Sequence, residues 1–113
     1  MEAQVRQEQD VTVVTLSGEL DATNNQELSE VLDKELGEGR RRFVVDLGGV
    51  GFVDSSGIAT LVRFYKNVQA GSGEMCLAQP QPPVKRIFEL TRLDQVFDIY
   101  PDFTEAVRHF EAR

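Results

Sequence analysis

The sequence has little cysteine and histidine and no long apolar run. Its one cysteine, Cys76, excludes an intrachain disulfide, so we expect a reducing compartment in which this residue is a buried structural thiol. With one histidine and scattered carboxylates, the chain offers no ligand-spaced cluster for zinc or iron. No apolar stretch approaches the roughly 20 residues of a membrane span, and the polar N-terminus lacks the apolar core of a secretion signal. We therefore expect a cytoplasmic protein without a membrane anchor.

Positive charge is also scarce. The 113 residues carry a formal net charge of −7, with 19 acidic against 12 basic residues. This balance disfavours nucleic-acid backbones and anionic membrane surfaces, which attract clustered positive charge. The one basic run, Arg40-Arg41-Arg42, is typical of a solvated turn that enters a strand. We expect a protein as the partner, and the lack of an obvious exposed apolar patch favours a monomer when free.

The length and the hydrophobic content of 41% fit one domain that spans residues 1–113. Apolar runs rich in β-branched residues predict four strands and a hairpin partner for the first of them. These strands are Val11–Leu16, Phe43–Leu47, Glu74–Ala78 and Val96–Tyr100, with residues 3–8 as the hairpin partner. Helical spacing predicts helices over about Asn24–Leu36, from the paired serines to about Ala70, after Pro83, and after Asp102.

Local signals predict where these elements begin and end. Gly18 is expected to end the first long strand, and the glycines of residues 48–51 to loosen the backbone before Phe52. Thr23 and Gln26 form a capping-box pattern for the first helix. The order ββαβαβαβα with short connections predicts an α/β fold, in which four helices pack against a mixed, mostly parallel sheet.

The most informative stretch is Val53-Asp54-Ser55-Ser56-Gly57-Ile58, which lies between an apolar strand and an amphipathic helix. The N-terminus of a helix carries about half a positive charge and several unpaired N–H groups, so it favours an anion. Ser55 or Ser56 is therefore a candidate nucleophile, helix cap or phosphate acceptor. These three interpretations imply different proteins.

Catalysis has little support. A hydrolase would use Ser55 or Ser56 as the nucleophile and His109 as the base, but this histidine lies in the predicted last helix. The serines also do not match the Gly-x-Ser-x-Gly elbow of α/β hydrolases, and the glycines of residues 48–51 lack the lysine of a P-loop. We expect no catalytic residue, no metal site and no cofactor. A phosphorylated contact patch and plain helix capping remain.

Three segments together resemble the STAS-domain anti-sigma-factor antagonists, the small bacterial proteins of partner-switching pathways. They are Ser17-Gly18-Glu19-Leu20-Asp21 before a capped helix, Val45-Asp46-Leu47 through Ile58, and Pro83-Val84-Lys85-Arg86-Ile87-Phe88 followed by Leu93. The resemblance spans nearly the whole chain and implies a single STAS-like domain. The order and spacing of the three segments make this joint signal strong.

The resemblance also implies roles for individual residues. It assigns the phosphate to Ser55, with Ser56 as a neighbour that caps the helix or contacts the partner. Asp21 and Asp54 match acidic positions that flank the phosphorylation site of the family, which implies partner contact or kinase recognition. Gly57 would let the partner backbone approach closely.

The mechanism that the resemblance implies is a switch without enzyme activity in this chain. The unphosphorylated protein binds an anti-sigma factor that is also a serine kinase of the GHKL type, and the sigma factor or another client is released. The kinase, with its own ATP and Mg²⁺, phosphorylates Ser55 and binding is lost; a PP2C-type serine phosphatase restores it. The alternatives are a STAS sensory or scaffold module whose serines only cap the helix, and a small serine hydrolase.

Overall fold

The computed structural model describes residues 1–111 and has the expected element order. The strands are β1 (Glu2–Glu8), β2 (Val11–Leu20), β3 (Arg42–Val53), β4 (Glu74–Ala78) and β5 (Asp98–Tyr100). The helices are α1 (Asn25–Gly37), α2 (Ser55–Ala70), α3 (Pro82–Leu90) and α4 (Phe103–Glu111), with a short 3₁₀ turn η1 (Leu93–Gln95) before β5. The order ββαβαβαβα is thus confirmed.

The five strands form one sheet in the order β1-β2-β3-β4-β5. β1 pairs with β2 antiparallel as a hairpin, whereas the three other pairs are parallel. Parallel neighbours need a crossover on a face of the sheet, and helices supply these crossovers here. The sheet is therefore mixed and mostly parallel, as the sequence predicts.

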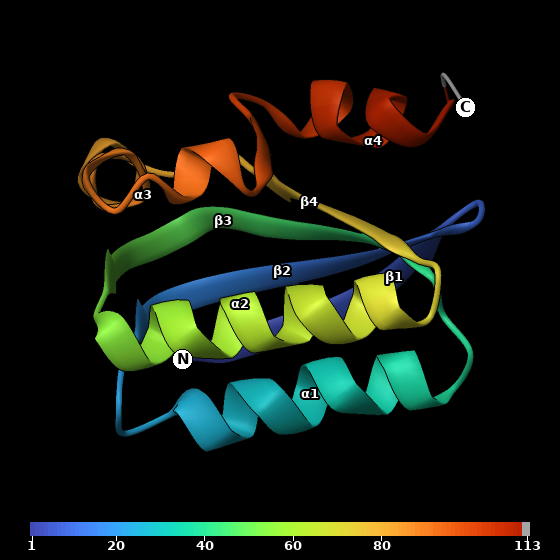
Figure 1. Ribbon diagram of the computed structural model, residues 1–113, viewed down its shortest axis with the longest axis horizontal. Coiled ribbons are helices and arrows are strands. Elements are labelled where there is room, and N and C mark those ends of the chain that lie inside the picture. Colours follow the sequence, from blue (N-terminus) through green and yellow to red (C-terminus); the bar gives the residue numbers. More distant parts are fainter. Residues whose placement is uncertain (112–113) are drawn as a thin grey trace.

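Helices cover both faces of the sheet. Figure 1 shows α1 and α2 side by side on one side of the strands and α4 on the opposite side. The first face packs with α1, α2 and α3 into one apolar core, which includes Val14, Val45 and Leu77. The second face packs with α4 into a smaller core that includes Val13 and Val44. Adjacent strand residues are buried because each of the two faces is covered.

Cys76 lies in this second core and is a free, buried thiol, as expected. Burial raises the pKa of the Cys76 thiol to about 12, and the nearby carboxylates of Asp98 and Glu74 add to the shift. A thiol with this pKa stays protonated at neutral pH and is a poor nucleophile. Cys76 is therefore a packing residue.

β2 and β3 are longer than the glycine pattern predicts. β2 continues through Gly18 at a φ of +97°, and irregularities in its register with β3 follow Thr15 and Gly18. At Gly49, an added Cβ would lie 2.9 Å from the Cβ of Ser17. These glycines let two bulged strands pair closely, so the expectation that they end or loosen the strands is wrong.

The last elements differ only in length. β5 begins at Asp98 rather than at Val96, because the chain is still turning out of η1 at Val96. The helix expected after Asp102 is capped by this residue: the Asp102 carboxylate accepts a 2.8 Å hydrogen bond from the N–H of Glu105. Within residues 1–111, no helix has both the length and the apolar character that a membrane crossing requires.

The parallel strands place the connections of the chain at two opposite ends of the sheet. Figure 1 shows the β2–α1 and β3–α2 connections together at one end, and the α1–β3 connection at the other. The first end carries the paired serines, and the second carries Arg40-Arg41-Arg42. We call them the serine end and the arginine end.

Candidate functional site

Asp54 joins β3 to α2 at the serine end. Its backbone is extended, and its N–H donates to the carbonyl oxygen of Leu20 at 3.0 Å, which anchors the end of β3 beside β2. Its carboxylate Oδ1 accepts hydrogen bonds from the N–H groups of Ser56 and Gly57 at 2.9 and 3.0 Å. A side chain that accepts from the second and third residues of a helix is an N-cap, so Asp54 determines where α2 begins.

These contacts also set the charge of Asp54. The hydrogen bond from the Gly57 N–H is the largest cause that lowers the pKa of this carboxyl below its ordinary value of 3.8. Partial desolvation opposes the shift, whereas the hydroxyl and N–H of Ser56 and the N–H of Ala22 favour it. Asp54 is therefore ionised at neutral pH and gives the start of α2 a fixed negative charge.

The two serines have different surroundings. The Ser56 hydroxyl donates to Asp54 Oδ1 at 2.9 Å, and this side chain is partly buried. Ser55 is the first residue of α2, is exposed, and makes no side-chain hydrogen bond within the described part of the chain. Of these two hydroxyls, that of Ser55 is therefore the one that is exposed and makes no hydrogen bond to the described residues.

Gly57 has a role inside the chain. It is buried, and a Cβ at this position would lie 2.6 Å from the carbonyl oxygen of Leu20 and 2.9 Å from its Cβ. A side chain at position 57 would push α2 away from the end of β2. The expected contact between Gly57 and a partner stays a prediction.

Asp21 lies in the neighbouring β2–α1 connection. Its carboxylate Oδ1 accepts from the N–H and hydroxyl of Thr23 at 3.0 and 2.5 Å, and its N–H donates to the Asn24 side chain at 3.0 Å. The predicted capping box of Thr23 and Gln26 is wrong, since Asp21 engages Thr23 and the N-cap residue is Asn24, without a side-chain cap bond. Asp21 thus stabilises a loop that touches Asp54 through Ala22.

A shallow groove extends from this site between α1 and α2. It has a volume of about 470 Å³. Its lining residues are Asn25, Gln26, Ser29, Ser56, Ala59, Thr60 and Arg63. The Arg63 guanidinium donates to the Ser29 hydroxyl across the groove, which ties the two helices together. The serine end therefore continues into a polar surface.

Sequence reasoning missed one residue at this end, Phe52. Its side chain is 48% exposed, although it lies in a short apolar run that reads as buried. Its neighbour Val53 is 2% exposed. Successive side chains of a strand point to opposite faces, so a buried Val53 implies that Phe52 faces the other way. This signal was missed because the strand predicted from the sequence ends at Leu47, before this segment.

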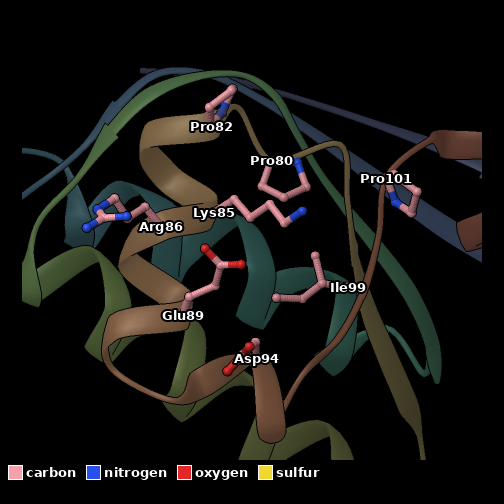
Figure 2. Close-up of a pocket in the computed structure, with 8 residues that line it drawn as sticks. All are labelled: Pro80, Pro82, Lys85, Arg86, Glu89, Asp94, Ile99 and Pro101. Carbon is pink, nitrogen blue, oxygen red and sulfur yellow. The ribbon is translucent and has the colours of Figure 1, made fainter.

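A separate hollow of about 740 Å³ lies between α3 and β5. Figure 2 shows Lys85 and Glu89 extending from α3 over this space, with Pro80 and Ile99 on its other sides. None of the predicted site residues lines it. It is therefore not part of the serine end.

The structure does not bring together the residues that a hydrolase would need. His109 lies on α4, where its Nδ1 is 2.7 Å from the Tyr100 hydroxyl, on the opposite face of the sheet from α2. In the described part of the chain, no group of three His, Cys, Asp or Glu side chains could hold a metal ion. Ser55 therefore has no base of the expected kind, and a hydroxyl without a base is a poor nucleophile.

Comparisons with known proteins agree with this fold. The STAS domain family model matches residues 2–106. The chain is 29% identical over 102 residues to the anti-sigma F factor antagonist of Paenibacillus polymyxa, which covers 89% of this chain and 87% of that protein. The crystal structure of an anti-sigma factor antagonist from Mycobacterium paratuberculosis has a TM-score of 0.88 and 27% identity, and covers 96% of this chain and 92% of that one.

A more distant structure shares the fold. The Bacillus cell fate determinant SpoIIAA, solved in its phosphorylated form, has a TM-score of 0.73 and 21% identity. The match covers 99% of this chain and 100% of that one.

Proposed function

The chain belongs to the STAS domain family, and on this premise we propose that it is an anti-sigma-factor antagonist whose docking is controlled by phosphorylation of Ser55. The family is regulatory rather than enzymatic, which agrees with the expectation of no enzyme activity in this chain. The names of the relatives support an anti-sigma factor as the partner. The finer identification of that partner as a serine kinase of the GHKL type, opposed by a PP2C-type phosphatase, belongs to this proposal.

One observation carries the assignment of the phosphate: at the start of α2, the Ser55 hydroxyl is exposed and uncommitted, whereas the Ser56 hydroxyl is bound to Asp54. The fold relative solved in a phosphorylated form supports a modification of this kind. Asp21 and Asp54 would contact the kinase from either side of Ser55. Since the proposed partners are cytoplasmic, the proposal also places the chain in the cytoplasm.

The chemistry belongs to the partners. The kinase transfers the γ-phosphoryl group of its ATP to Ser55 Oγ, its own base accepts the hydroxyl proton, and ADP is released. The phosphatase hydrolyses the phosphoserine to serine and inorganic phosphate. This chain contributes the acceptor oxygen, and the Asp54 cap holds that oxygen at the start of α2.

A phosphate on Ser55 would remain exposed in the surface where the partner docks, because the start of α2 has few free N–H groups to bind it. The N–H groups of Ser56 and Gly57, which an anion at a helix N-terminus would otherwise bind, already donate to Asp54. A phosphate adds about −1.5 to −2 charges. With these donors occupied and the Asp54 charge close by, the phosphate would point outward and replace a small neutral group in the docking surface. A full switch of populations, from 1:99 to 99:1, needs about 5.5 kcal/mol of differential affinity.

The proposal is tested by incubating the wild type, Ser55→Ala and Ser56→Ala with ATP and the GHKL-type kinases of the same genome, followed by mass spectrometry of the peptides. We expect phosphate on the wild type and on Ser56→Ala, none on Ser55→Ala, and unchanged kinase binding by Ser55→Ala. A wild type that binds a kinase without being phosphorylated would indicate a scaffold module and overturn the switch. Phosphate on Ser56 would overturn the assignment.

A further inference from the structure

We propose that Phe52 is the apolar anchor of the docking surface and enters a pocket of the anti-sigma partner that is lined by apolar groups and bordered by Lys or Arg. The proposal rests on the proposed function, because the occupant of this surface is taken to be that same partner. In this proposal Phe52 supplies affinity for the anti-sigma partner, whereas phosphorylation of Ser55 controls whether the partner binds.

The exposure of Phe52 is exceptional for its residue type in this chain. Phe52 is the one phenylalanine among residues 1–111 whose side chain is exposed, at 48%. The others are buried or partly buried: Phe43, Phe64, Phe88, Phe97, Phe103 and Phe110. An exposed aromatic ring gains more from a partner than any other side chain of this surface, since aromatic residues dominate the centres of protein interfaces.

The backbone holds Phe52 rigidly beside the switch serine. Phe52 pairs with Glu19 in the β2–β3 register, and the next pair is Val53 with Leu20, whose side chains are buried. A Cβ added at Gly51 would meet nothing within 4 Å, so the approach to the strand is open on that side. Because the distance from Phe52 to Ser55 along the chain is at most about 11 Å, a partner that covers one also covers the other.

The charges around Phe52 identify the kind of partner. The residues nearest the serine end, 18–28 and 50–60, contain no Lys or Arg. Their charged residues are all acidic: Glu19, Asp21, Glu27 and Asp54. Arg63, which lines the adjoining groove, donates to the Ser29 hydroxyl. Glu19, which lies opposite Phe52 in the register, is exposed. A surface of this sign matches a basic rim on the partner and would repel nucleic acid or an anionic membrane.

The same charges disfavour a second copy of this chain as the occupant. Two serine ends that face each other would bring Glu19, Asp21 and Asp54 of both copies together, without basic residues from either stretch. Like charges in an interface oppose association. A different protein with a basic rim is therefore the occupant that the surface fits.

The test measures the affinity of the unphosphorylated chain for the purified GHKL-type partner by calorimetric titration. Phe52→Ala is expected to weaken binding at least tenfold, as truncation of a central aromatic residue does. Phe52→Leu should retain part of the affinity, because it keeps an apolar side chain. Leu90→Ala is the matched control, since Leu90 is 69% exposed on α3, and it should bind within about twofold of the wild type.

Circular dichroism and thermal unfolding of each variant show whether it is folded before the titration. If Phe52→Ala is folded and binds within twofold of the wild type, the anchor is overturned. If Phe52→Leu loses as much affinity as Phe52→Ala, the proposal that Phe52 enters an apolar pocket is overturned. A wild type that binds none of the kinases would instead contradict the proposed function, so the two failures are distinguishable.

Discussion

The two ends of the sheet use the same way of joining strands to helices, but they leave different groups exposed. At each end a glycine permits close packing: Gly57 lies against Leu20 at the serine end, and a Cβ at Gly73 would overlap the carbonyl oxygen of Arg41 at the arginine end. At the arginine end, the Arg41 guanidinium donates to the carbonyl oxygens of Arg40 and Leu36 at 2.9 and 3.5 Å. That end thus uses a charged group for its own structure.

The acidic residues of the serine end also stabilise their own connections, but two other side chains of this end stay exposed. Asp54 and Asp21 bind backbone N–H groups of their own connections, while Ser55 and Phe52 remain exposed beside them. An exposed hydroxyl and an exposed ring on a rigid frame suit recognition, since recognition needs fixed but unsatisfied groups. In this molecule, charge alone therefore does not mark a binding surface.

The largest expected difference between the ends concerns a charge at the docking surface. Ser55→Asp should weaken binding of the anti-sigma partner by about 3 kcal/mol, more than hundredfold, because a larger, charged side chain replaces the small neutral hydroxyl, must lose its water in the interface and lies beside the Asp54 charge. The control Arg40→Asp changes the net charge more, but at the exposed arginine end, and should alter the affinity less than about threefold. Calorimetric titration measures both; equal losses would mean that net charge, not position, governs docking.

The two tightly packed glycines, one at each end, should differ in their effect on partner binding but not in their effect on stability. Gly57→Ala and Gly73→Ala should each lower the free energy of unfolding by about 1–3 kcal/mol, since the added methyl group overlaps backbone atoms. Gly37→Ala is the control, because its Cβ would meet nothing within 4 Å. Urea denaturation measures the three variants. Only Gly57→Ala should also weaken partner binding, and equal weakening by Gly73→Ala would contradict the division of roles.

A smaller effect is expected from pH at the serine end. Because the pKa of Asp54 is lowered on folding, its ionised form stabilises the fold above its unfolded pKa, and this contribution is lost as pH falls through the lower folded pKa. Urea denaturation of the wild type and Asp54→Ala should therefore differ more at neutral pH than in acid below about pH 3. A difference that is constant with pH would show that the cap does not depend on the charge.

The smallest effect is expected from Ser56→Ala. It removes the 2.9 Å hydrogen bond to Asp54 but leaves the backbone cap in place, so the free energy of unfolding should fall by about 0.5–1.5 kcal/mol. Chemical denaturation measures the change, and the affinity for the partner should stay within about threefold of the wild type. A loss of binding as large as that of Ser55→Asp would reverse the roles of the two serines.

The sequence predicts the element order and the sheet type because both follow from periodicity, which is local. It fails where a neighbouring strand decides the outcome: Gly18 was expected to end a strand, but pairing with β3 carries β2 through it. The capping box fails for a local reason, since the Asp21 carboxylate, two residues before Thr23, binds its hydroxyl. The unequal surroundings of Ser55 and Ser56 depend on which of the two hydroxyls reaches the Asp54 carboxylate, and the pattern Asp-Ser-Ser-Gly leaves this open.

The most direct test of the central claim is the affinity of the purified anti-sigma partner for the chain phosphorylated at Ser55, compared with the unmodified chain under the same conditions. We predict that the unmodified chain binds and that the phosphorylated chain binds more than hundredfold more weakly, with binding restored after treatment with a PP2C-type phosphatase. Equal affinities of the two forms would contradict the account.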